Sequence, residues 1–177
     1  WEKARRSYGT PDPLDVVDLS GRVMLVTGAN SGIGFEIAQF AASRGARTYM
    51  LCRNAERAEA ARAKIVSAAA TRNCSADVHV LLGDTGLRTD MERCVAEFCS
   101  RESCLDALVC NAGVLLNERQ ETAEGYEVTF ASHLLFGSYM LADRLEAKLT
   151  ASSWERGARC VFVSSGGMYN RGMFSLA

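Results

Sequence analysis

Thr27-Gly28-Ala29-Asn30-Ser31-Gly32-Ile33-Gly34 is the stretch that decides the fold of this 177-residue chain. Residues 22–26, just before it, are mostly apolar and partly β-branched, which predicts a buried parallel strand. Residues 35–42, just after it, carry apolar side chains at helical spacing and predict a helix that stops at Gly45. The glycines therefore lie in a strand-to-helix turn, where helix amides and the helix dipole favour a phosphate.

Each glycine of this Gly-x-x-x-Gly-x-Gly pattern has a predicted role. Gly28 permits the tight turn, Gly32 lets the backbone approach a pyrophosphate, and Gly34 lets the helix pack closely on the strand. The spacing differs from the common G-x-G-x-x-G pattern, and the alternative is a glycine-rich turn that holds no ligand.

Composition and charge exclude several classes of protein. The net charge is −1 and 48% of the residues are hydrophobic, as in ordinary soluble globular proteins. We expect neither nucleic acid nor a membrane surface as a partner, and no apolar run approaches the roughly 18 residues that a transmembrane helix needs. The chain starts at Trp1, so we expect its true N-terminus and any targeting signal to be missing.

The seven cysteines form no C-x-x-C pair, and the chain has only two histidines. We therefore predict no metal site. Free thiols are favoured over disulfides, which indicates the cytoplasm or another reducing compartment.

Strands and helices alternate along the chain. Strands are predicted at residues 22–26, 47–52, 77–82, 105–110 and 159–163. Helices are predicted at 54–70 with Asn54 as its cap, from a capping box at Thr89-Asp90-Met91-Glu92, and over a long stretch at 122–150. This alternation predicts an α/β fold with a doubly wound parallel sheet, Rossmann-like, in one domain at 21–177 that follows an N-terminal arm at 1–20.

Polar or glycine-rich residues follow every predicted strand. Beyond the first turn these are Arg53, Asp84, Asn111-Ala112-Gly113 and Ser164-Ser165-Gly166-Gly167. Ligands of such sheets bind beyond the carboxyl ends of the strands, near the point where the strand order reverses. The sequence therefore predicts one ligand site at this edge of the sheet.

With these residues identified, the chain resembles the short-chain dehydrogenase/reductase family over about residues 21–170, and within it the retinol-dehydrogenase-like branch. The resemblance implies a nicotinamide dinucleotide held by the turn, with Asp84 at the adenine and Asn111, Ala112 and Gly113 along the cofactor. The turn residues included in this predicted site are Gly28, Asn30, Ser31, Gly32, Ile33 and Gly34. The alternative to the adenine-binding role of Asp84 is that it is only a turn residue before the next helix.

Arg53 decides the predicted cofactor. An acidic residue at the end of the second strand would bind the ribose 2′-hydroxyl of NAD, whereas a guanidinium pairs with the 2′-phosphate of NADP. Because Cys52-Arg53-Asn54 contains no acid, we predict NADP, with NAD as the less favoured cofactor. The alternative is a solvated arginine at a helix start.

Ser165 is the predicted catalytic residue, with Ser164 as its rival. The resemblance implies that this serine binds the substrate oxygen while hydride is transferred. The family also uses a Tyr-x-x-x-Lys pair, but Met173 stands four residues after Tyr169, which is also too close to Ser165. We therefore expect a chain that is incomplete at its C-terminus and inactive by itself, with an apolar stripe of the long helix, including Leu135 and Tyr139, left facing solvent.

A second departure concerns an asparagine that the family places in the long helix. This chain has none between Asn117 and Asn170, and His133 lies closest to the expected position. A histidine there could hold a water or carry a proton, although a packed or solvated histidine is the more common case.

The predicted function is an NADP-dependent oxidoreductase that moves hydride between the nicotinamide and a carbonyl or alcohol. The resemblance implies an apolar small-molecule substrate and a parent protein that forms a homo-oligomer. The alternative is a non-catalytic dinucleotide-binding or scaffold protein of the same fold.

Overall fold

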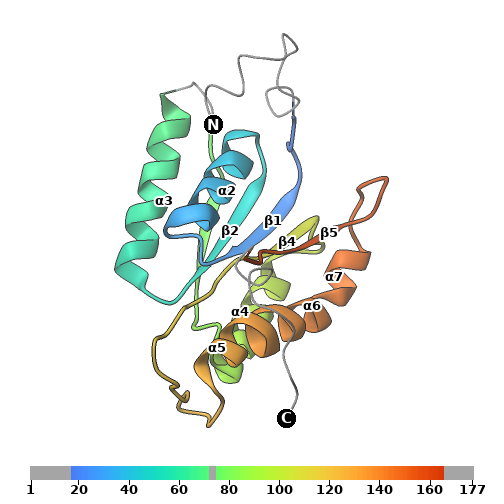
Figure 1. Cartoon of the computed structure of the whole chain (residues 1–177). Coiled ribbons are helices and arrows are strands. Elements are labelled where there is room, and N and C mark those ends of the chain that lie inside the picture. The colour runs from blue at the N-terminus through green and yellow to red at the C-terminus, as the bar shows by residue number, and fades with distance from the viewer. Residues whose placement is uncertain (1–16, 72–74, 166–177) are drawn as a thin grey trace, which may run out of the picture.

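Five parallel strands form the centre of the molecule (Figure 1). The computed structural model describes residues 17–71 and 75–165. The strand order is β3-β2-β1-β4-β5. Strands β2 and β3 therefore lie on one side of β1, and β4 and β5 lie on its other side. The strands are β1 (Val23–Thr27), β2 (Arg47–Cys52), β3 (Val78–Leu82), β4 (Ala107–Cys110) and β5 (Arg159–Phe162). The predicted Rossmann-like fold is confirmed, and each predicted strand lies within two residues of the observed one.

Helices cover both faces of the sheet. On one face lie α2 (Gly32–Ser43) and α3 (Ala55–Ala70), and the Asn54 side chain accepts a hydrogen bond from the Arg57 N–H at 2.8 Å, which confirms the predicted cap. The other face carries α4 (Arg88–Arg101), α5 (Val128–Phe130), the π-helix η2 (Ala131–Met140) and α6 (Leu141–Arg144). The short α7 (Glu146–Thr150) leads to β5.

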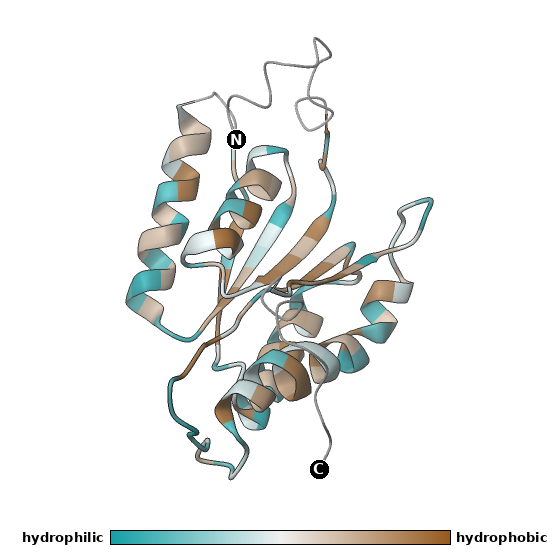
Figure 2. Ribbon diagram, viewed as in Figure 1, coloured by the Kyte–Doolittle hydropathy of each residue, from teal (hydrophilic) through white to brown (hydrophobic). Residues whose placement is uncertain are grey.

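Alternate side chains of each strand enter different cores. In β1, Leu25 packs toward α4 and α6, whereas Val26 packs toward α2 and α3. Both side chains are fully buried, as are Leu108 and Val109 of β4. The strands are therefore apolar on both faces. In Figure 2, hydrophobic residues run along the centre of the sheet, whereas α3 carries many hydrophilic residues.

The prediction of one long helix over 122–150 is wrong. Residues 120–128 instead form a hairpin, the helix begins at Val128, and it contains ten residues of π-helix. A Cβ on Gly137 would collide with the carbonyl oxygen of Ser132, five residues earlier, so this wide turn requires a glycine. Of the predicted exposed stripe, Tyr139 is exposed, but Leu135 packs against the main core.

The predicted capping box of α4 is also wrong. The helix starts one residue before Thr89, its N-cap is Leu87, and Glu92 pairs with Arg88 at 2.9 Å instead of turning back to the cap. A carboxylate from a distant loop, Glu124, binds the first amides of α4.

The cysteines of the described part of the chain are free thiols, as predicted. Burial raises the pKa of Cys52 to about 11 and that of Cys110 to about 12, so both remain protonated at neutral pH. Among the residues that the structure describes, no helix is both long and apolar enough to cross a bilayer. Residues 1–16 of the predicted arm lie outside the described part, whereas Leu19 is buried beside α2.

A buried carboxylate joins the starts of three strands at the edge opposite the predicted ligand site. The Asp106 side chain is 1% exposed and accepts hydrogen bonds from the Val23 N–H at 2.8 Å and from the Ser152 hydroxyl at 2.7 Å. The Arg22 guanidinium lies 3.7 Å away, and the Asp106 carbonyl accepts the Arg159 N–H. This side chain therefore fixes β1 and β4 against the loop that leads into β5.

Replacing Asp106 with asparagine is expected to lower the free energy of unfolding by about 2 kcal/mol, because the amide group cannot accept at both positions and a buried donor loses its partner. Urea denaturation followed by circular dichroism measures this change. Asp143→Asn is the control, because Asp143 is half exposed with only a 4.0 Å contact to Arg144. Equal midpoints for the two variants would contradict this role of Asp106.

Candidate functional site

The turn after β1 is held against two neighbouring strands. Gly28 has φ +67°, and its N–H donates to the Leu51 carbonyl of β2 at 2.8 Å. A Cβ on Gly28 would lie 2.9 Å from the Ala112 Cα, which is closer than packed atoms allow. Both the backbone conformation and the approach of the chain after β4 therefore require a glycine here.

The start of α2 is left open toward the end of the sheet. Ser31 is the N-cap residue, but its side chain makes no capping hydrogen bond. Gly32 has φ +56°, and a Cβ built there meets no protein atom within 4 Å. The first amides of α2 thus have no acceptor from the Ser31 side chain, and the absence of a side chain at Gly32 leaves open space beside them. This is the arrangement of a helix start that binds an anion.

Thr27 ties the turn to residues 111–113. Its buried hydroxyl oxygen accepts the N–H groups of Asn111 at 2.9 Å and Ala112 at 2.8 Å. The Asn111 amide in turn donates to the Thr27 carbonyl at 3.0 Å. A Cβ on Gly34 would collide with that Asn111 amide and with the Gly28 carbonyl, so α2 can pack this closely only with a glycine.

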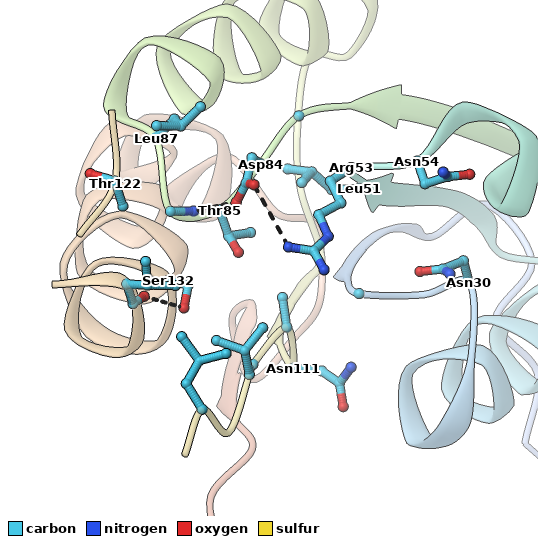
Figure 3. Close-up of a pocket in the computed structure, with 18 of the residues that line it drawn as sticks. Asn30, Leu51, Arg53, Asn54, Asp84, Thr85, Leu87, Asn111, Thr122 and Ser132 are labelled. Atoms are coloured by element: carbon cyan, nitrogen blue, oxygen red, sulfur yellow. Dashed lines mark hydrogen bonds and ion pairs between the residues drawn. The ribbon is translucent and has the colours of Figure 1, made fainter. Parts of the chain in front are cut away.

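These segments enclose a pocket of about 700 Å³ beyond the carboxyl ends of the strands (Figure 3). Its volume is in the range of small-molecule and cofactor sites. In Figure 3, Asn30, Arg53 and Asn54 lie on one side and Thr85, Leu87, Thr122 and Ser132 on the other, with Asn111 below. The pocket lies where the strand order reverses between β1 and β4, as the sequence predicts.

Arg53 and Asp84 meet across the upper part of the pocket. An Arg53 guanidinium nitrogen lies 3.9 Å from an Asp84 carboxylate oxygen, and the two side chains are 66% and 37% exposed. The other Asp84 oxygen accepts the Gly86 N–H at 2.8 Å, while the Asp84 N–H donates to Asp90. Asp84 is thus fixed by its own turn, and Arg53 is held by one exposed contact that contributes about 0–1 kcal/mol.

The structure brings most of the predicted site residues together. Those that line the pocket are Gly28, Asn30, Ser31, Arg53, Asp84, Asn111, Ala112 and Gly113. Gly32, Ile33 and Gly34 are outside the lining: the Ile33 side chain is 64% exposed and Gly34 is buried in the helix contact. Ser165 is exposed and follows β5 at the same edge of the sheet, but it is not among the lining residues. Tyr169 lies outside the described residues.

His133 touches the same loop from the helical side. Its Nε2 accepts the Val114 N–H at 2.6 Å. A Cβ on Gly113 would lie 2.8 Å from the same nitrogen, so the imidazole packs directly on the loop. This contact supports the loop after β4, and a role for His133 in proton transfer stays a prediction.

Sequence reasoning gave no role to two residues that shape the site. Thr27 precedes the first glycine, but its hydroxyl can accept hydrogen bonds from residues 111 and 112 only because β1 and β4 are neighbours in the sheet. Glu124 carries no motif in the sequence, yet it binds the start of α4. Neither role has a local sequence signal, because the partners are more than 30 residues apart.

Within the described residues, no group of three histidine, cysteine or acidic side chains could hold a metal ion. The polar groups of the pocket are amides, hydroxyls, one aspartate and two arginines, Arg53 and Arg57. Such a set suits a polar organic ligand with anionic groups.

Comparison with known proteins agrees with this geometry. The family model described as short chain dehydrogenase matches residues 22–174, and the chain therefore belongs to the short-chain dehydrogenase/reductase family of oxidoreductases, which bind a nicotinamide cofactor. The chain is 36% identical over 168 residues to dehydrogenase/reductase SDR family member 12 of Bos taurus, covering 95% of this chain and 50% of that protein. Retinol dehydrogenase 12 of Bos taurus is 40% identical over 151 residues, with 84% and 45% covered.

The chain thus spans about half the length of these relatives. Among solved structures, the Pseudomonas aeruginosa RhlG/NADP active-site complex matches with a TM-score of 0.62 at 26% identity, covering 81% of this chain and 52% of that chain. The fold and the family are therefore the ones predicted from the sequence.

Replacing Thr27 with valine is expected to destabilise the chain by about 1–3 kcal/mol, because two partly buried N–H groups lose their acceptor. Thr27→Ser is the control, since serine keeps the hydroxyl and removes only a methyl group. Thermal and urea unfolding of both variants measures the difference. A valine variant as stable as the serine variant would contradict the role given to the Thr27 hydroxyl.

Proposed function

We propose that this chain forms the NADP-binding part of an oxidoreductase that transfers hydride between the nicotinamide and a carbonyl or alcohol substrate. The observation that carries the proposal is the uncapped start of α2: a Cβ on Gly32 would meet open space, and the N-cap residue Ser31 lines the pocket. Unpaired helix amides attract the negative charge of a diphosphate. The turn residues from Gly28 to Gly34 would hold the diphosphate, and Asn111, Ala112 and Gly113 would lie along the rest of the dinucleotide.

Arg53 supports NADP over NAD. The pocket carries two arginines, Arg53 and Arg57, at the end of β2 and the start of α3. Among the residues that line the pocket, the only acidic one is Asp84, whose contact with Arg53 is exposed and weak. A 2′-phosphate forms stronger, charge-assisted hydrogen bonds with a guanidinium and would displace this contact. NAD offers only a hydroxyl at that position, so it would gain less.

The chemistry of hydride transfer belongs to the nicotinamide when it is bound. The protein would bind, orient and polarise the reactants. Ser165, at the ligand end of β5, is the proposed donor to the substrate oxygen as charge develops there. No Tyr-x-x-x-Lys pair occurs in the 177 residues, so we expect this chain by itself to bind dinucleotide without turnover.

Further parts of the proposal concern the surroundings of the site. Residues 21–177 would form the dinucleotide-binding domain, and the substrate would be an apolar small molecule, as the relation to retinol dehydrogenases suggests. Exposed Phe130, Leu134 and Tyr139 support self-association of the parent protein. The free thiols fit the cytoplasm or another reducing compartment.

A second candidate is a dinucleotide-binding protein without catalysis. Such a protein would keep the glycine turn and the pocket but would not use a Tyr-x-x-x-Lys pair. The two functions differ in turnover: an oxidoreductase that contains this chain consumes NADPH with a carbonyl substrate, whereas a non-catalytic protein only binds it.

Arg53→Ala is expected to raise the Kd of the chain for NADPH by about tenfold to a hundredfold, since it removes a charge-assisted hydrogen bond. The Kd for NADH should change little. Isothermal titration calorimetry with both dinucleotides measures the two constants. Arg62→Ala, which removes an exposed arginine that pairs with Glu59, is the control and should leave both unchanged. A wild-type preference for NADH, or equal losses for both cofactors, would overturn the assignment of NADP.

A further inference from the structure

The loop before α5 forms a closed hairpin that makes one wall of the pocket. The Thr122 N–H donates to the Tyr126 carbonyl at 2.7 Å, and the Val128 N–H donates to the Gln120 carbonyl at 3.0 Å. Gln120, Thr122, Ala123 and Val128 line the pocket from this hairpin. At its far end, the Tyr126 ring packs edge-on against Phe136 at 5.1 Å.

Beside the hairpin, on the same side of the pocket, lies the turn between β3 and α4. Thr85, Gly86 and Leu87 line the pocket there, and α4 begins at the next residue. A Cβ on Gly86 would lie in ordinary contact, 3.6 Å from the Thr122 Cγ2, so the turn and the hairpin are close neighbours. Figure 3 shows Leu87 and Thr85 facing Thr122 and Ser132 on this side.

Glu124 joins the hairpin to the start of α4, directly after the β3–α4 turn. One carboxylate oxygen accepts the Arg88 N–H at 2.7 Å, and the other accepts the Thr89 N–H at 3.1 Å and the Thr89 hydroxyl at 2.9 Å. The N-cap residue of α4, Leu87, has no side-chain acceptor, so Glu124 supplies the cap from the hairpin.

The charge of Glu124 is favoured at this position. Hydrogen bonds from the Arg88 and Thr89 amides lower the pKa of its carboxyl below the ordinary value, so it is ionised at neutral pH. A carboxylate at a helix N-terminus also interacts favourably with the helix dipole.

We propose that Glu124 is a positioning residue for the dinucleotide: by capping α4 it holds the 120–128 hairpin against the β3–α4 turn and so fixes this side of the pocket. This inference rests on the proposed function, because the pocket is taken as the dinucleotide site. Without the carboxylate, the hairpin keeps its internal hydrogen bonds but loses its attachment to α4. The pocket wall then has to be ordered by the ligand itself, which weakens binding.

The test compares Glu124→Ala and Glu124→Gln with the control Glu121→Ala. Glu121 lies on the same hairpin, but its half-exposed side chain pairs with Arg119 at 2.7 Å on the surface. Binding of NADPH is measured at 25 °C by its fluorescence, and amide hydrogen exchange is measured on the same proteins without ligand.

Glu124→Ala is expected to raise the Kd for NADPH by about fivefold, which is the loss expected for one helix cap. Glu124→Gln, which keeps an oxygen acceptor, should fall between Glu124→Ala and the wild type. Exchange should increase in residues 120–127 and at the Arg88 and Thr89 amides in Glu124→Ala. It should not increase in Glu121→Ala.

An unchanged Kd together with faster exchange would reduce Glu124 to a purely structural cap and would overturn the proposal. Unchanged exchange would overturn it as well, since the hairpin would then be held by other contacts. If the wild-type chain bound neither NADPH nor NADH, the proposed function would fail. The exchange comparison would still show whether Glu124 holds the hairpin.

Discussion

The close approach of the ends of β1 and β4 is the constraint on which the rest of the structure depends. At this point the Thr27 hydroxyl accepts two backbone N–H groups of the segment after β4, and Gly28 leaves room for the Ala112 backbone. Because the strand order reverses between these two strands, the loops after them diverge toward opposite faces of the sheet. The space between the loops is the pocket, so a packing requirement of the core and the position of the ligand site have the same origin.

The polar groups around this pocket differ in how firmly they are held. Asn111 and Asp84 are fixed by hydrogen bonds to their own and neighbouring backbone. Arg53 has one exposed contact at 3.9 Å, and the first amides of α2 have no acceptor from the Ser31 side chain. The groups best suited to an anion are therefore the ones with the fewest internal partners. Such an arrangement costs the fold some capping energy and leaves that interaction for a ligand.

The sequence predicts the sheet well because its signals are local. β-Branched and apolar runs mark each strand, and Asn54 caps α3 through a contact three residues away. The glycine turn and the polar residues after each strand also locate the pocket, since all strands are parallel and end at one edge. Eight of the residues predicted for the cofactor line it.

What the sequence could not predict depends on contacts between distant segments. Thr89 to Glu92 has the pattern of a capping box, but Glu124 reaches the first amides of α4 from another loop, so a strong local pattern gives the wrong cap. The ten-residue π-helix follows from Gly137 lying against the Ser132 carbonyl, and apolar periodicity does not distinguish it from an α-helix. Ser165 lies at the ligand edge of the sheet but outside the pocket lining, and its role at the substrate oxygen, which rests on the resemblance, stays a prediction.

The central claim is that the amides at the start of α2 bind a diphosphate in the space above Gly32. Gly32 and Gly157 both have positive φ, at +56° and +73°, and a Cβ on either meets no protein atom within 4 Å. Valine at either position therefore introduces similar backbone strain, but only valine at 32 enters the proposed diphosphate space. The decisive measurement is NADPH binding by calorimetry for Gly32→Val and Gly157→Val. The account predicts no measurable binding for the first and wild-type affinity for the second, whereas a Gly32→Val affinity within about twofold of wild type would contradict it.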